Sequence, residues 1–127
     1  MVVHVPRNLV FLAALFVFAG MMHFVYPAAY AAVTPSWVPL PFQAVYLSGL
    51  AEIAGGIGLL PVRTRRAAGI GLIVLLIAVF PANIGMLASA VATGAPDFYK
   101  AVLFLRLPLQ PLLIVWIYRS AVASATR

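Results

Sequence analysis

Cysteine is absent from the 127-residue sequence. The chain therefore forms no disulfide bond, and it has no thiol that could take part in a thiol relay. Redox chemistry that uses disulfide bonds or thiols of the chain itself is therefore excluded.

Charged residues are scarce as well. They make up 8% of the chain, against about 25% in an average soluble domain, while 65% of the residues are hydrophobic. So few charges cannot cover a soluble surface, and we expect the protein to lie in a membrane. Eight Lys and Arg residues outweigh Glu52 and Asp97, which gives a net charge of +6. The basic residues are scattered between apolar runs, unlike the clustered patch of a nucleic-acid-binding protein.

Long apolar runs make up most of the sequence. Each has the ~20 residues that a helix needs to cross a bilayer core of ~30 Å; the runs are residues 9–28, 42–61, 67–90 and 99–118. Backbone groups in hydrocarbon must be paired within their own segment, so each run is predicted to be a helix. Short connections make successive helices antiparallel. The sequence therefore predicts an all-α membrane protein, with one domain over residues 1–127 and four transmembrane helices in an up-down-up-down bundle.

Arginine placement predicts the orientation. Arg63, Arg65 and Arg66 ("RTRR") lie between the second and third runs, and further arginines flank the two ends of the chain. By the positive-inside rule, both termini and "RTRR" should be on the inner side of the cytoplasmic membrane. A cleaved signal peptide is the competing interpretation of the N-terminal segment, because Arg7, the run 9–20 and "AAYA" imitate its three regions. The length of the run favours a span.

Five polar residues interrupt the runs: His23, Glu52, Asn83, Arg106 and Gln110. With a rise of 1.5 Å per residue and alternating helix direction, all five fall in one layer near the middle of the membrane. Charges in lipid turn inward and find partners, so we expect Glu52 to pair with Arg106 and the other three side chains to lie nearby. The layer is either a ligand or proton site, or a clamp that only fixes helix register.

Small residues support this inward orientation. Such residues let membrane helices pack closely. Ala19 and Gly20 share a helix face with His23. Four small residues share a face with Glu52: Ser48, Gly49, Gly55 and Gly56. Aromatic residues at the ends of the runs are interpreted as membrane-interface anchors; they are Tyr30, Trp37, Tyr46 and Tyr99.

The remaining motifs indicate no cofactor site. "AGGIGLL" lacks the GxGxxG spacing and the strand-turn-helix context of a phosphate loop. "MMHF" could suit Cu(I) in principle, but His4 is the only other histidine. We predict no metal site and no intrinsic cofactor, with a bound quinone or lipid as the open alternative.

Several segments resemble the DoxX-like family of small four-helix membrane proteins. They occur in order from about Gly20 to Trp116: "GMMHF", "WVPLP", "SGLAEIAGGIGLL", "RRAAG", "FPANI" and "RLPLQPLLIVW". The resemblance implies a four-span bundle in a bacterial cytoplasmic membrane. It also implies a redox association, since the wider family includes a subunit of a thiosulfate–quinone oxidoreductase and an accessory protein for methylamine dehydrogenase maturation.

Three functions are compatible with the sequence. The first is a quinone- or small-amphiphile-binding accessory subunit of a membrane oxidoreductase, because inward polar groups in an apolar bundle suit a ligand with a polar head and an apolar tail. The second is a structural or assembly subunit that binds other membrane subunits, or copies of itself, without a ligand. The third is a proton or solute conductor, which would need polar groups continuing to both surfaces. Independent catalysis is not expected.

The orientation can be tested by cysteine labelling, because the native chain has no cysteine. A cysteine introduced in "RTRR" should react with a membrane-impermeant maleimide only from the cytoplasmic side, and one at Ser36 only from outside. The reverse pattern would contradict both the orientation and the depths assigned to the polar residues.

Overall fold

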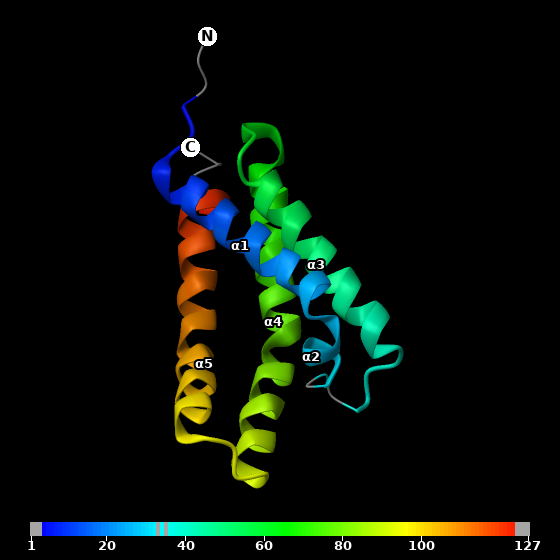
Figure 1. Cartoon of the computed structure of the whole chain (residues 1–127). Coiled ribbons are helices and arrows are strands. Elements are labelled where there is room, and N and C mark those ends of the chain that lie inside the picture. The colour runs from blue at the N-terminus through cyan, green and yellow to red at the C-terminus, as the bar shows by residue number, and fades with distance from the viewer. Residues whose placement is uncertain (1–3, 33, 35, 124–127) are drawn as a thin grey trace.

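The computed structural model describes residues 4–32, 34 and 36–123, and within them every regular element is a helix (Figure 1). The elements are α1 (Arg7–Val25), α2 (Pro27–Ala32), α3 (Pro41–Gly58), α4 (Val62–Ala92), α5 (Asp97–Ile117) and the π-helical turn η1 (Tyr118–Ala123). The predicted all-helical fold is confirmed. Three helical segments of this part of the chain are long and apolar enough to cross a membrane: α1, α4, and α5 continued through η1.

Prolines set the starts of the helices. Pro6, Pro61 and Pro96 directly precede α1, α4 and α5, whereas Pro27 and Pro41 are the first residues of α2 and α3. A proline is tolerated at a helix start because the first amide groups have no intrahelical partner, and its fixed φ suits the first turn. Pro27 also explains why the predicted run 9–28 is divided: α1 ends at Val25 and a second, short helix begins.

The second and third predicted runs are also shifted at their boundaries. Helix α3 ends at Gly58 rather than at residue 61, and α4 begins at Val62 instead of residue 67. "RTRR" is therefore part of a helix and not a loop. Arg65 donates from Nε to the carbonyl oxygen of Leu59 at 2.9 Å and from Nη2 to that of Leu60 at 2.8 Å. It thereby satisfies carbonyl groups left free at the end of α3.

The hydrophobic core lies at one end of the molecule, where α1, η1 and the α3–α4 turn meet. Its buried residues are Leu9, Leu12, Phe16, Leu59, Leu72, Leu76, Ile117 and Ala121. At the same end, Asn8 donates a 2.6 Å hydrogen bond from Nδ2 to the Ser120 hydroxyl. Helix α5 packs along α4, and η1 extends the contact to α1.

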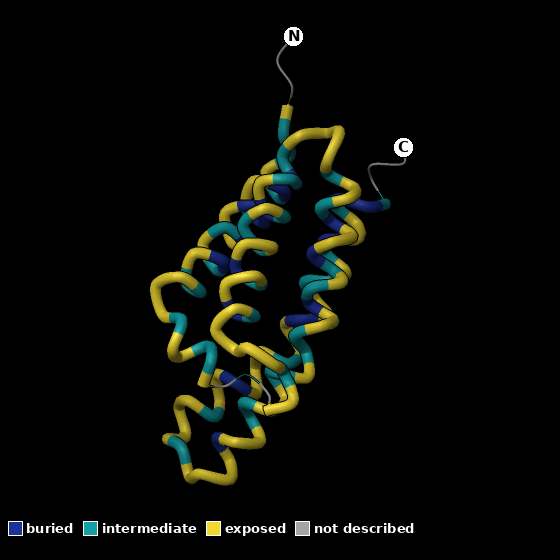
Figure 2. Tube along the Cα trace, turned by 90° about the vertical axis from the view of Figure 1, so that its right-hand side faces the viewer, coloured by how far each residue is buried: buried dark blue, intermediate teal, exposed yellow. Residues whose placement is uncertain are grey.

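Much of the chain is exposed (Figure 2), and the exposed residues include many large apolar side chains. Phe18, Phe98 and Phe104 are 62%, 82% and 63% exposed. Exposed apolar area on this scale is costly in water, whereas lipid is as apolar as these side chains. The surface and the three long helices together support a membrane location.

Glycines bring α1 and α3 into close contact. A Cβ atom added at Gly20 would lie 2.5 Å from the carbonyl oxygen of Gly49, and one at Gly49 would lie 2.6 Å from Cβ of His23. A Cβ at Gly56 would lie 2.9 Å from the carbonyl oxygen of Ala13. No ordinary side chain fits at these distances, so the small residues set the spacing of the two helices.

Replacing Gly49 by Ala should therefore destabilise the protein by about 1–3 kcal/mol, the usual cost of overpacking. Gly71→Ala is the matched control, since a Cβ there meets no atom within 4 Å. Unfolding free energies of the two variants in detergent give the comparison. Equal stabilities would mean that the α1–α3 contact tolerates a methyl group.

Candidate functional site

A cavity of about 590 Å³ lies beyond the hydrophobic core and receives side chains from all of α1 to α5. Its walls are largely apolar, with Leu15, Val79 and Leu109 among the lining residues. All five residues of the predicted polar layer line it: His23, Glu52, Asn83, Arg106 and Gln110. The structure thus brings together residues that the sequence places on four separate helices.

Glu52 forms its ion pair with His23. Nε2 of His23 and Oε2 of Glu52 are 3.0 Å apart, and the two side chains are only 13% and 15% exposed. The predicted Glu52–Arg106 pair is wrong, because no such ion pair forms among the residues that the structure describes. The physical reason is the glycine contact: it holds α1 against α3, whereas α5 packs on α4 and the cavity separates it from Glu52.

The other nitrogen of His23 determines where the protons lie. Nδ1 is 3.0 Å from the backbone carbonyl oxygen of Val45. A carbonyl oxygen only accepts hydrogen bonds, so Nδ1 carries a hydrogen and donates it. Nε2 and the Glu52 carboxyl oxygen then face each other with one proton between them, which either atom can hold.

Tyr30 covers the other side of the His23 ring. The two ring centroids are 4.2 Å apart and the planes differ by 22°. Burial raises the pKa of the Tyr30 hydroxyl above its ordinary value; the Glu52 charge adds to the rise, and the Arg106 charge opposes it. The phenol is therefore neutral at physiological pH. Sequence reasoning interprets Tyr30 as an interface anchor and misses this role, although its position just after Pro27 in a separate short helix places it near His23.

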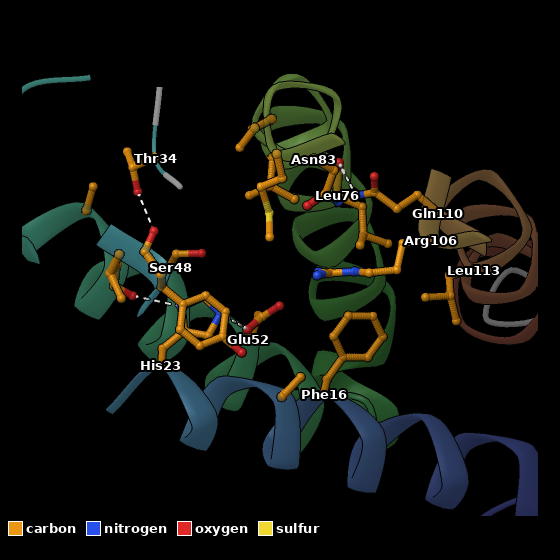
Figure 3. Close-up of a pocket in the computed structure, with 18 of the residues that line it drawn as sticks. Phe16, His23, Thr34, Ser48, Glu52, Leu76, Asn83, Arg106, Gln110 and Leu113 are labelled. Atoms are coloured by element: carbon orange, nitrogen blue, oxygen red, sulfur yellow. Dashed lines mark hydrogen bonds and ion pairs between the residues drawn. The ribbon is translucent and has the colours of Figure 1, made fainter. Parts of the chain in front are cut away.

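Arg106 extends from α5 into the cavity, toward Glu52 and His23 (Figure 3). Within the described part of the chain it has no carboxylate within ion-pair distance. A guanidinium group has five hydrogen-bond donors and is always charged. It is therefore the strongest free donor group in the cavity.

The two amide side chains differ in role. Gln110 is buried and donates from Nε2 to the backbone carbonyl oxygen of Leu76 at 3.3 Å, which ties α5 to α4. Its Oε1 atom is buried without a hydrogen-bond partner in the described structure, and so is Oε2 of Glu52 apart from its ion pair. Buried oxygens of this kind usually have a partner from water or a ligand. Asn83 lines the cavity from α4.

The segment between α2 and α3 contributes further cavity residues, namely Thr34, Trp37 and Val38. Thr34, whose hydroxyl donates to the Tyr30 carbonyl oxygen at 2.9 Å, and Trp37 both line the cavity. The sequence also indicates an interface anchor at Trp37, and at 73% exposure this residue lies at the rim. Among the described residues, no three His, Asp or Glu side chains gather into a possible metal site.

The ion pair can be tested with two double-mutant cycles. One combines Glu52→Gln with His23→Phe, which keeps a ring against Tyr30, and the other combines Glu52→Gln with Arg106→Leu. Unfolding free energies in detergent should give a coupling of about 1–3 kcal/mol for the first cycle, as for residues in contact, and a smaller one for the second. A larger coupling to Arg106 would contradict the observed pairing of Glu52 with His23.

The chain matches the model of a known protein family. A family model described as a domain of unknown function (DUF8561) matches residues 12–121, from α1 to η1. No curated protein and no solved structure matches the chain. The matched segment contains all five residues of the polar layer. Because it covers most of the chain, the protein belongs to the DUF8561 family.

Proposed function

We propose that this protein is a four-span membrane protein that binds a small amphipathic ligand in the cavity between its helices. In this proposal α3 is the fourth span, and the helices form an antiparallel bundle with both termini and "RTRR" in the cytoplasm. An accessory role for a membrane oxidoreductase system follows from the resemblance to the DoxX-like family, which is part of the proposal.

The length of α3 supports its assignment as a span. At 1.5 Å per residue, its 18 residues extend about 27 Å, close to the ~30 Å of a bilayer core. Helix α3 is not among the three segments that are long and apolar enough by composition alone, and it carries Gln43, Glu52 and four glycines. Glu52 faces the cavity, and Gly49 and Gly56 face α1, so these residues do not require contact with lipid.

The single observation that carries the ligand proposal is the position of Arg106. A charged group at membrane depth normally faces the protein interior and pairs with an opposite charge or an acceptor. Arg106 faces the interior, but its side chain enters a cavity and has no carboxylate partner among the described residues. A ligand with an acceptor head would supply that partner.

The shape and chemistry of the cavity favour an amphiphile. Ligand pockets are typically apolar with a few convergent polar groups, and their volumes run from about 300 to 1,000 Å³; this cavity, at about 590 Å³, falls within that range. Apolar side chains from α1, α4 and α5 would surround the tail. The family resemblance suggests a quinone as the ligand. The carbonyl oxygens of a quinone can accept hydrogen bonds from Arg106.

The proposal can be tested with decylubiquinone as the probe. Trp37 lines the cavity and the chain has one other tryptophan, Trp116, so the Trp116→Phe variant leaves a single reporter. In lipid nanodiscs, the quinone should quench Trp37 fluorescence saturably. Arg106→Leu should weaken the binding at least about tenfold, because hydrogen bonds to charged groups contribute about 1.5–3 kcal/mol.

Arg63→Leu is the matched control, because Arg63 is exposed, belongs to "RTRR" and does not line the cavity. It should leave quenching unchanged. Non-saturating quenching that is equal in the Arg106 and Arg63 variants would mean partition into lipid only. That outcome would favour the alternative of a structural or assembly subunit without a ligand.

A further inference from the structure

The net charge of the cavity can be counted from its lining residues. This net charge restricts the charge that the head group of a ligand should carry. Among the described residues that line it, the titratable or charged side chains are His23, Tyr30, Glu52 and Arg106. The restriction rests on the proposed function, because it concerns the ligand of that same cavity.

The His23–Glu52 pair contributes no net charge. Nδ1 of His23 keeps its hydrogen because the Val45 carbonyl oxygen accepts it. Nε2 and Oε2 are 3.0 Å apart, and two lone pairs at that distance would repel each other, so one proton lies between them. If Nε2 holds it, an imidazolium faces a carboxylate; if Oε2 holds it, a neutral imidazole faces a neutral acid. The sum is zero in either case.

The other two groups leave one positive charge. Tyr30 is neutral because burial raises the pKa of its hydroxyl. An arginine side chain is always protonated in proteins. The Arg106 side chain points toward His23 and Glu52 (Figure 3), and these two residues already form an ion pair with each other. The cavity wall therefore carries a charge of one positive unit in a region of low polarity. An uncompensated charge in such surroundings is costly, and a bound anion removes that cost.

We infer that the ligand of this cavity is an amphiphile whose head carries a single negative charge, held by Arg106. A fatty acid, an anionic phospholipid and an ionised hydroxyquinone share this chemistry. A neutral quinone would leave this charge uncompensated. Head charge, and not the quinone ring, is then the main determinant of affinity.

Laurate and dodecanol are suitable probes, because they have the same chain length and differ in head charge. Binding is measured by Trp37 fluorescence of the Trp116→Phe protein in phosphatidylcholine nanodiscs, corrected for partition into protein-free discs. The measurement is made at about pH 8, where a carboxyl group with an ordinary pKa near 4 is ionised. Laurate should bind at least about tenfold more tightly than dodecanol, as expected for a charge-assisted hydrogen bond.

Four variants identify Arg106 as the source of the preference. Arg106→Gln should abolish the laurate preference and Arg106→Lys should keep most of it. Arg106→Glu should reverse it, so that dodecylamine binds more tightly than dodecanol. Arg63→Gln removes a positive charge outside the cavity and should leave the preference intact, which separates local pairing from general attraction of anions to a basic protein.

The outcomes separate this inference from the proposed function. Equal affinity for laurate and dodecanol, both saturable, would overturn the inference and leave the amphiphile site standing. Failure of laurate, dodecanol and decylubiquinone to bind saturably would overturn both. If the preference is found, mass spectrometry of lipids retained by the wild type but not by Arg106→Gln distinguishes a fatty acid from a phospholipid as its natural source.

Discussion

The contact between α1 and α3 determines the rest of the site. Gly20 and Gly49 let the two backbones approach so closely that a methyl group at either position would collide with the other helix. That approach places His23 beside Glu52, and the Val45 carbonyl oxygen then fixes the hydrogen on Nδ1. A carboxylate in an apolar helix is thus tolerated because its partner is on the neighbouring helix. Because Glu52 pairs with His23, the same spacing leaves Arg106 without Glu52 as its ion-pair partner.

The uneven distribution of packing explains why a cavity exists at all. Buried leucines and Phe16 join α1, α4 and η1 at the end where the described chain begins and finishes, and Asn8 and Ser120 add a hydrogen bond there. Farther along, α5 stays with α4 while α3 stays with α1. The helices are fixed at one end and separated by the cavity beyond it. Phe16 and Leu76 belong both to the core and to the cavity wall, so the core forms the closed end of the site.

The sequence is sufficient to predict the helices and the polar residues that converge, because both depend on properties that run along the chain. Apolar run lengths indicate the main helices, and helix rise places His23, Glu52, Asn83, Arg106 and Gln110 at one depth, where all five line one cavity. The partner of Glu52 cannot be predicted in the same way. Depth alone does not distinguish His23 from Arg106, since the choice depends on which helices touch. The glycines of both helices carry that information, but by themselves they indicate only which faces point inward.

The short helix α2 shows a second limit of the sequence. A helix of six residues, which begins at Pro27, is too short to show a periodic pattern, so the sequence assigns Tyr30 to the membrane interface rather than to the His23 ring. The same limit applies to the charged residues within the apolar helices. Glu52 has its ion-pair partner within the protein, because His23 lies 3.0 Å away on the neighbouring helix. Arg106 is different: it points into a cavity among neutral groups, and the described fold gives it no compensating carboxylate. Of the two, Arg106 is the residue whose partner the proposed anionic ligand would supply.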